Sequence, residues 1–236
     1  MANQIAGNAK NILVGASPLF LSNLDVTTTG YVENFAPGEA GSTAPAFSAP
    51  TTTLDGKSYT DTLNEVTAST TPAFFYRNVG FTNNGLQVTY NPSYGSVTVD
   101  QLLDTAKLFK ESMEVMIATE MAEGTLENVL AVFGQRSSTL TTGALTDKLG
   151  LAGGALGEAP TERQLVAVGA APTSEATATE RVYYARRVLS VQQSQFSLAR
   201  NAASTFPVTF RLLPDGAKPG QEYGFIVDRV LNKTGA

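Results

Sequence analysis

The stretch from Met113 to Gly134, MEVMIATEMAEGTLENVLAVFG, contains the two patterns that decide the expected fold. Over 114–121 the odd positions form a mainly apolar set from Val115 to Met121, and the even positions include Glu114 and Glu120. Alternation with a period of two is typical of a β-strand with one buried face. We therefore expect a strand over 114–121 whose other face is wet or in contact with a partner.

A short helix is expected directly after this strand. Thr125 can accept hydrogen bonds from amides of the next turn, and Glu127 lies where the positive helix end favours a carboxylate. Gly134 provides the left-handed residue that ends a helix. The apolar side chains recur with helical spacing at Leu126, Val129, Leu130 and Phe133. Because the helix is short and has a single apolar face, we expect these four residues to pack on a sheet.

Composition narrows the chemistry available to the chain. It has 236 residues, enough for one large β-rich domain or two small ones, and contains no cysteine, histidine or tryptophan. This composition removes disulfides, thiolate and imidazole metal ligands, and every mechanism that needs a Cys or His nucleophile or base. We expect no enzyme activity, no metal and no cofactor, and burial of roughly 70% of the unfolded surface in a sizeable core.

Charge and hydropathy indicate the setting. A net charge of -5 argues against a domain that binds nucleic acid by neutralising phosphates, although it suits a surface past which DNA slides. The apolar runs are too short to span a bilayer. Lys10 precedes only the brief apolar run 12–14, which does not form a signal peptide. We expect no membrane anchor and synthesis in the cytoplasm.

The N-terminal part of the chain indicates strands and one long irregular segment. Residues 11–21 are expected to form an opening or edge strand, and the threonine-rich and aromatic run 24–35 another. From about 36 to 58 the chain is dominated by Pro, Gly, Ala, Ser and Thr, which predicts a long loop or arm.

Strand character continues after this arm. An aromatic cluster over 73–81 is followed by Asn83-Asn84-Gly85, a strong hairpin signal. Two short strands, 86–90 and 94–99, are expected on either side of the turn-forming pair Asn91-Pro92.

Residues 100–109 fit two interpretations. Their apolar side chains form one helical face that would continue through Met113 and Met116 as a single long helix. We favour a short helical or irregular turn followed by a strand, because 114–121 alternates cleanly and Glu123-Gly124 would break a continuing helix.

The C-terminal half predicts an exposed insertion followed by a sheet. The segment at about 135–160 is rich in Gly, Thr, Ala and Leu with little period, and we interpret it as an exposed or partner-ordered insertion. Pro214-Asp215-Gly216 is expected to form a tight turn. Five strand-like runs follow one another closely: 164–168, 181–191, 195–200, 206–213 and 223–231. Closely spaced antiparallel strands imply a β-sandwich or β-barrel, so we expect one mainly β domain over 1–236 with a flanking α-helix.

Two motifs suggest phosphate binding but have simpler explanations. The glycine-rich run 150–157 lacks the Lys-Ser or Lys-Thr pair of a P-loop and a strand-loop-helix setting, so we expect a flexible loop. Arg186 and Arg187 are adjacent, and strand alternation directs adjacent side chains to opposite faces. We therefore expect paired surface or interface charges there.

Two carboxylate pairs provide a rival, enzymatic hypothesis. Glu120 with Glu123, and Asp100 with Asp104, are close enough in sequence to suggest acid and base roles. Nothing in the sequence brings either pair into a common cleft. A hydrolase that uses Glu120 or Glu123 is the alternative that this proximity motivates.

Three stretches in order resemble the major tail tube proteins of long-tailed bacteriophages, a family that is similar to the tubes of type VI secretion systems. The first is NVGF at 78–81 through LQVTY at 86–90, and the second is Met113–Gly134 with AEGTLEN at its joint. The third is YARRV at 184–188 leading through 195–200 to FPVTFRLL at 206–213. The segments 36–50 and 135–159 depart from the family pattern.

The resemblance implies a β-barrel or β-sandwich flanked by a helix, in which six copies join their sheets into a ring and rings stack into a hollow tube. DNA would pass through the lumen during ejection without specific binding. The implied partners are other copies of the chain, the tape-measure protein, and tail terminator or tip proteins. The implied location is the tail of the virion.

The resemblance also assigns assembly roles to particular residues. A strand with free edge groups demands a partner, and a closed ring removes such edges. On this basis the expected inter-subunit strand presents Glu114, Met116, Ala118 and Glu120. An arm anchored by Phe35, Phe47 and Tyr59 is expected to reach a neighbouring ring, with a plain surface loop as the alternative. The structural alternatives are a tube ring of a bacterial contractile injection system and a head-decoration protein.

Overall fold

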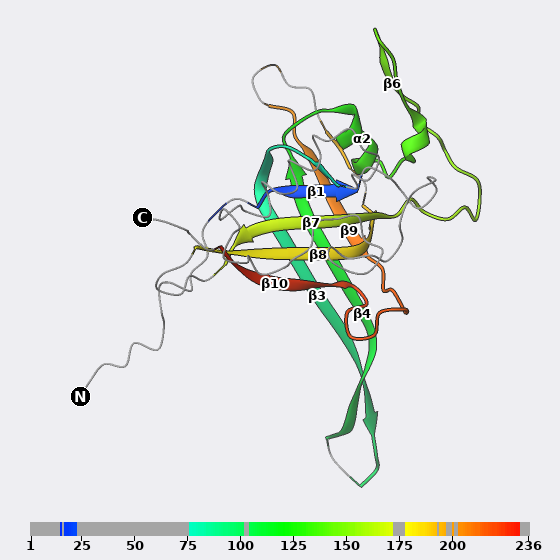
Figure 1. Cartoon of the computed structure of the whole chain (residues 1–236). Coiled ribbons are helices and arrows are strands. Elements are labelled where there is room, and N and C mark those ends of the chain that lie inside the picture. Colours follow the sequence, from blue (N-terminus) through cyan, green and yellow to red (C-terminus); the bar gives the residue numbers. More distant parts are fainter. Residues whose placement is uncertain are drawn as a thin grey trace.

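One large antiparallel sheet is the main element of the described part of the protein (Figure 1). The computed structural model describes residues 15, 17–22, 76–101, 104–171, 178–192, 194–196, 200 and 203–231. Its strands are β1 Leu19–Ser22, β2 Tyr76–Asn78, β3 Thr82–Thr98, β4 Thr105–Met121, β7 Arg163–Ala170, β8 Ala178–Ser190, β9 Phe206–Leu212 and β10 Gly224–Leu231. The strand order is β2-β1-β7-β8-β9-β4-β3, and β10 pairs with β8. The mainly β fold with antiparallel pairing is confirmed.

The sheet bends over itself so that its two halves face each other. In Figure 1 the diagonal strands β3, β4 and β9 cross behind β1, β7 and β8. The two halves are joined at β8, whose residues 188–190 pair with β9 while residues 178–185 pair with β10. β2 and β3 end the strand order and do not pair with each other, so the described strands form no closed barrel.

The core lies between these two halves of the sheet. One half contributes Leu19, Leu21, Leu165, Ala167, Ala185 and Val188, and the other contributes Val115, Ile117, Met121, Phe206, Val208, Phe210 and Leu212. All of these side chains are buried. Burial of the odd positions 115–121 of β4 confirms the expected alternation, because a strand directs successive side chains to opposite faces.

The helix α2 (Leu126–Val132) closes one end of this core. Its start is capped as expected, since the Thr125 hydroxyl accepts a hydrogen bond from the Asn128 amide. It ends at Val132, and Gly134 just beyond it has a φ of 62°, the left-handed conformation expected of a helix stop. The expected apolar set includes buried Leu130, while Leu126, Val129 and Phe133 are half-buried. The face that packs deepest carries Asn128, Leu130, Ala131 and Val132.

The region from Thr82 to Met121 differs from the sequence expectation. Asn91-Pro92 does not separate two strands, because β3 runs through it and Pro92 pairs with Met113. Proline is tolerated there because β3 lies at the edge of the sheet. Asn83-Asn84-Gly85 is not a hairpin turn but an irregularity within β3, where the register shifts between Asn83 and Gln87. Both the short helical turn and the long helix are wrong over 105–109, which belong to β4.

In the C-terminal sheet, β10 follows β9 in sequence but pairs with β8, because the loop between them carries the chain across the sheet. One expectation about this region is wrong. The expected strand over 195–200 is absent from its described residues 195–196 and 200. In the segment at 135–160, η2 (Ser137–Thr139) leads into a small hairpin of β5 (Leu140–Thr142) and β6 (Asp147–Leu149).

Candidate assembly surfaces

The β3–β4 hairpin extends well beyond the body of the protein (Figure 1). Near the body, Val88 pairs with buried Ile117 and Tyr90 pairs with buried Val115, so this face of β3 continues the core face. Towards the tip the same face carries Tyr94, and Leu108 pairs with Ser96 on it. We call the four side chains Val88, Tyr90, Tyr94 and Leu108 the apolar stripe. Tyr90 is 65% exposed and Leu108 is 64% exposed.

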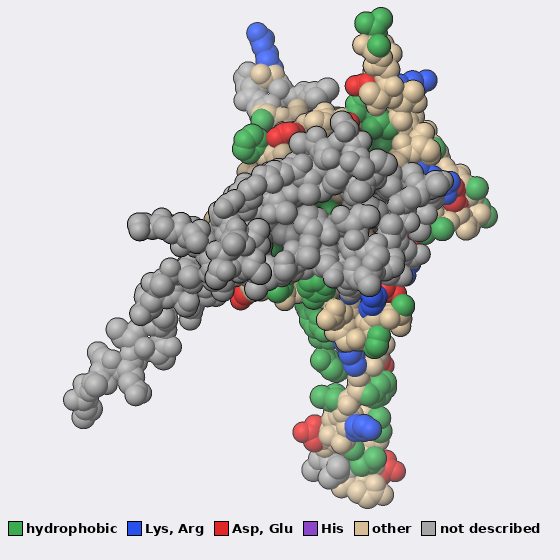
Figure 2. Space-filling view, in the orientation of Figure 1, with side chains coloured by type: hydrophobic (Ala, Val, Ile, Leu, Met, Phe, Trp, Pro, Cys, Tyr) green, Lys and Arg blue, Asp and Glu red, His purple; other side chains and the backbone are tan. Residues whose placement is uncertain are grey.

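The apolar stripe leaves a core-like surface without a cover. Figure 2 shows hydrophobic side chains along the projecting hairpin, interspersed with lysines and carboxylates. An isolated two-stranded hairpin is marginally stable in water, and exposed contiguous apolar surface on a soluble protein marks an interaction site. The stripe is therefore the strongest candidate binding surface in the described part of the chain.

Local contacts hold the hairpin in shape without covering the stripe. On the opposite face, the Phe109 ring lies over Gly95, where an added Cβ would come within 2.6 Å of the ring. An aromatic side chain over a cross-strand glycine supports strand pairing. The Lys110 ammonium lies 5.8 Å from the centroid of the Tyr90 ring, a cation–π contact on the stripe face.

The free edges of the sheet differ in part from those that the sequence suggested. Residues 116–121 of β4 lie between β3 on one side and β9 on the other, so this part of β4 is not a free edge of the sheet. In the large described sheet, β2 and β3 end the strand order, β10 pairs only with β8, and residues 105–115 of β4 have no partner strand on the side opposite β3. The edge argument for β4 was wrong over 116–121 because the position of a strand in a sheet depends on distant partners.

The four residues expected on the inter-subunit strand share the outer face of β4. Glu114, Met116, Ala118 and Glu120 are all partly exposed, opposite the buried odd positions. Glu114 lies 3.8 Å from the Arg211 guanidinium of β9. Contact between this face and another subunit stays a prediction.

The two glutamates of the hydrolase hypothesis are not brought together. Glu120 accepts hydrogen bonds from Asn84 and Thr205 and lines a hollow of about 210 Å³. Glu123 lines a different hollow and accepts a hydrogen bond of 2.9 Å from the Phe81 amide. Each carboxylate is therefore held by its own partners, and the geometry offers no shared acid and base from this pair.

The second carboxylate pair lies at the tip of the hairpin. Asp100 and Asp104 are both exposed, on the connection between β3 and β4. Asp104 accepts a hydrogen bond of 2.7 Å from the Thr105 amide, which fixes the start of β4. Both carboxylates therefore lie open to solvent.

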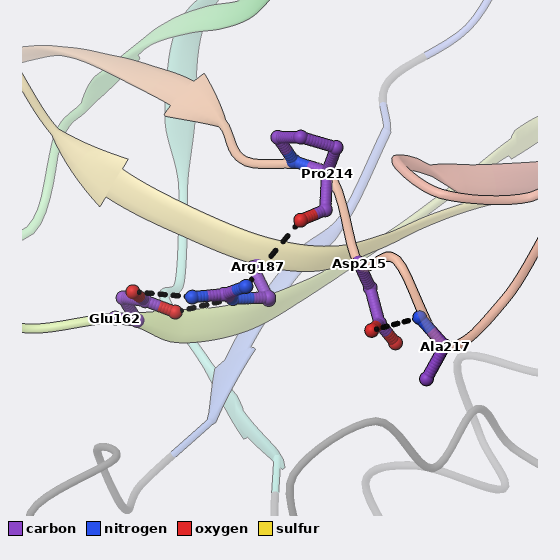
Figure 3. Close-up of polar contacts among 5 residues, drawn as sticks. All are labelled: Glu162, Arg187, Pro214, Asp215 and Ala217. Carbon is purple, nitrogen blue, oxygen red and sulfur yellow. Dashed lines mark hydrogen bonds and ion pairs between the residues drawn. The ribbon is translucent and has the colours of Figure 1, made fainter.

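The adjacent arginines of β8 point to opposite faces, as strand alternation predicted. Arg186 is fully buried, donates to Gln221 and lies against the rings of Tyr184 and Phe225. Arg187 makes a paired ion bridge to Glu162, with donor–acceptor distances of 2.6 and 2.8 Å (Figure 3). Both side chains are occupied in holding neighbouring segments.

The loop after β9 is tied to the same region of the sheet. Figure 3 shows that Arg187 also donates to the Pro214 carbonyl, and that Asp215 accepts from the Ala217 amide. These bonds fix the segment that carries the chain from β9 across to β10. The arginines of β8 thus serve structure, and they form no shared phosphate site.

A second hairpin projects from the other end of the protein. β5 and β6 rise near α2, away from the tip of β3–β4 in Figure 1. Leu145 at its turn is 96% exposed, and Leu156 in the glycine-rich loop is fully exposed. Gln135 holds this loop through two hydrogen bonds of 3.2 Å, with the amide and the carbonyl of Ala152.

The remaining sequence expectations concern residues or groups that add no site. Phe35, Phe47 and Tyr59 of the expected arm lie outside the described residues. Within the described ranges, no three acidic side chains gather to hold a metal ion. The one α-helix in those ranges is too short to cross a membrane.

Comparison with known proteins provides no family assignment. No protein-family model and no curated protein matches the chain. The function must therefore be argued from the surfaces together with the sequence resemblance. Sequence reasoning missed the apolar stripe, although the alternation of Val88, Tyr90 and Tyr94 across Asn91-Pro92 is the signal that could have revealed it.

Proposed function

We propose that the protein is a structural virion subunit that assembles with copies of itself into the tail tube of a long-tailed bacteriophage. The observation that carries this proposal is the β3–β4 hairpin, which projects from the body with the apolar stripe uncovered. An exposed apolar surface of this kind marks an interaction site. A second copy of the same chain can cover it without any other component. The sequence resemblance to tail tube proteins supplies the identity of the assembly.

The free edges of β3 and β10 support the same proposal. Unpaired edge strands invite pairing with other chains, and proteins that remain monomeric normally shorten or cover them. β3 is 17 residues long and lies at the end of the strand order. A ring of copies, six in the proposed tube, covers such edges by joining neighbouring sheets. In such a ring, strands of neighbouring subunits together would form the barrel that the family resemblance implies.

The proposed setting follows from the assembly. The tube lies in the virion tail, encloses the tape-measure protein during construction, and binds terminator or tip proteins at its ends. DNA passes through the lumen during ejection without specific contacts, and the net charge of -5 disfavours adhesion of phosphates to the wall.

Assembly of the purified protein tests the proposal. Sedimentation velocity and negative-stain imaging across a range of concentration and salt are expected to show rings or tubes. A variant with Tyr90→Ser, Tyr94→Ser and Leu108→Ser is expected to stay monomeric with an unchanged far-ultraviolet dichroism spectrum. Leu156→Ser, on a separate exposed loop, is the matched control and is expected to assemble normally.

Labelling of virions decides the biological setting. Antibodies against the protein are expected to bind broken tails along their length. Labelling confined to heads would favour the head-decoration alternative, and a wild-type protein that stays monomeric under every condition and is absent from tails would overturn the proposal. Neighbouring genes for capsid and tape-measure proteins would separate a phage tube from a bacterial injection apparatus.

A further inference from the structure

Phe81, immediately before β3, is an aromatic side chain held out in solvent by a fixed backbone. It is 79% exposed, whereas its near neighbour Val79 is buried. The Phe81 amide donates to Glu123 Oε1 at 2.9 Å, and the Phe81 carbonyl accepts from the Ala122 amide at 2.9 Å. A large aromatic group on a backbone that is already fixed loses little backbone entropy on binding, which is a property of interface anchors.

A hollow of about 310 Å³ lies beside Phe81. Its lining includes Pro18, Gly80, Phe81, Thr82 and Glu123. Gly80 has a φ of 82°, and an added Cβ at this position would collide with the Glu123 carboxylate. Only glycine therefore permits this arrangement of the backbone and Glu123. The volume is sufficient for an aromatic or aliphatic side chain from another molecule.

The outer part of the apolar stripe consists of Tyr94 on β3 and Leu108 on β4. Phe81 and this outer part lie towards opposite ends of the β3–β4 hairpin. Phe81 directly precedes Thr82, the first residue of β3, and Tyr94 lies close to its last residue, Thr98. A strand of this length spans about 50 Å. A contact between two different surfaces of identical chains is heterologous, and it produces an open stack when the copies are displaced along one direction.

We propose that Phe81 and the hollow beside it form the socket that receives the outer apolar stripe of a second copy. The occupant is a second copy because one chain carries both the exposed apolar stripe and the hollow beside Phe81 that can accept it. The two surfaces are separated along the direction of β3. In this contact Phe81 packs against Tyr94 and Leu108 of the second copy. This inference rests on the proposed function and names the surface through which successive copies stack.

Charge complementarity orients the contact. Lys110 lies on the stripe face of the hairpin, over Tyr90. Glu123 lines the socket, with Oε1 bonded to the Phe81 amide. Lys110 of one copy therefore meets Glu123 of the next at the edge of the apolar contact. A pair at this rim fixes the register of docking more than it adds affinity.

Cysteine cross-linking tests the contact directly, because the natural chain contains no cysteine. Single variants Phe81→Cys, Tyr94→Cys and Leu108→Cys are prepared, and Leu145→Cys on the β5–β6 hairpin is the control. Phe81→Cys protein is mixed with each of the others, assembled and oxidised. We expect disulfide-linked pairs with Tyr94→Cys or Leu108→Cys, and none with Leu145→Cys, since a disulfide requires Cα atoms within about 7 Å.

A second measurement gives the strength of the contact. Phe81→Ser is expected to raise the critical concentration for tube formation at least about thirtyfold, the effect of removing one interface anchor. Leu145→Ser is expected to leave this concentration unchanged. Lys110→Glu is expected to weaken stacking, and Lys110→Glu chains mixed with Glu123→Gln chains are expected to recover part of it.

The possible outcomes separate this inference from the proposed function. Wild-type tubes in which Phe81→Cys links to Leu145→Cys and not to the stripe would overturn the socket while leaving tube assembly intact. Wild-type tubes whose formation is indifferent to Phe81→Ser would have the same meaning. A wild-type protein that forms no assembly would overturn the proposed function.

Discussion

Replacement of Asn128 in α2 by alanine is expected to destabilise the fold strongly. Asn128 is fully buried, and its side chain joins three segments of the chain. Its amide nitrogen donates to the carbonyls of Val79 and Glu123, both at 2.9 Å, and its oxygen accepts from the Arg77 guanidinium at 2.7 Å. The substitution would therefore remove the partner of two carbonyl groups and one of the partners of a partly buried cation.

The expected magnitude follows from these three bonds. Each of the two bonds to neutral carbonyls contributes about 1 kcal/mol, and the bond to the charged guanidinium contributes about 2 kcal/mol. Their loss is expected to lower the free energy of unfolding by about 4 kcal/mol. Burial lowers the pKa of Arg77 below its ordinary value, although Glu127 and Glu123 oppose this shift. The guanidinium is therefore poorly hydrated, so a lost hydrogen bond to it is costly. For a domain of this size, the melting temperature would fall by about 8–16 °C.

Urea unfolding of the unassembled protein, followed by circular dichroism or tyrosine fluorescence, measures this effect, since the chain contains no tryptophan. Glu127→Gln, at the exposed neighbouring position, is the matched control and is expected to change stability by less than about 1 kcal/mol. A loss below about 1 kcal/mol for Asn128→Ala would refute the view that this side chain fixes the joint between β4, α2 and the start of β3.

Three further changes probe other parts of the fold. Gly224→Ala is expected to loosen β10, because Gly224 has a φ of 133° and an added Cβ would collide with the Tyr184 carbonyl. Faster amide hydrogen exchange over 224–231 would show it, and unchanged exchange would contradict it. Thr125→Ala is expected to cost about 1 kcal/mol through loss of the helix cap, measurable by urea unfolding. The hydrogen bond from Arg181 holds the pKa of Asp228 below its ordinary value. The resulting stability is complete above the unfolded pKa of about 4 and is lost as pH falls through the lower folded value. For this exposed pair it amounts to less than about 1 kcal/mol. Asp228→Asn is expected to be less stable than the natural chain at neutral pH, and a difference that persists at a pH below the folded value would contradict the assignment.

Local patterns were reliable where neighbouring residues set the structure. The strand over 114–121 and the capped helix after it depend on side-chain alternation and on the bond from Thr125, all within a few residues. The separation of Arg186 and Arg187 to opposite faces follows from the same local geometry. Such features are decided before any distant segment is placed, so the sequence alone predicts them.

Features that depend on residues far away in the sequence were harder to predict from local patterns. Asn91-Pro92 is normally turn-forming, but pairing with the opposite strand carries β3 through it, because an edge strand tolerates a proline without an amide. In the sequence, Asn128 has the pattern of an ordinary polar helix residue. Its role in joining segments becomes visible only in the folded structure, where it bonds to Arg77 and Val79.

The sequence by itself determined that this is a mainly β protein with a capped helix after a half-buried strand, and it excluded Cys- and His-based chemistry. These conclusions depend on composition and on periodicity, which are properties of short stretches. Tertiary structure decided which strands lie at the edges, that the described sheet stays open, and that the core face of β3 continues into solvent as the apolar stripe. Those properties depend on which distant segments cover which surfaces, and only the folded arrangement of the whole sheet fixes that.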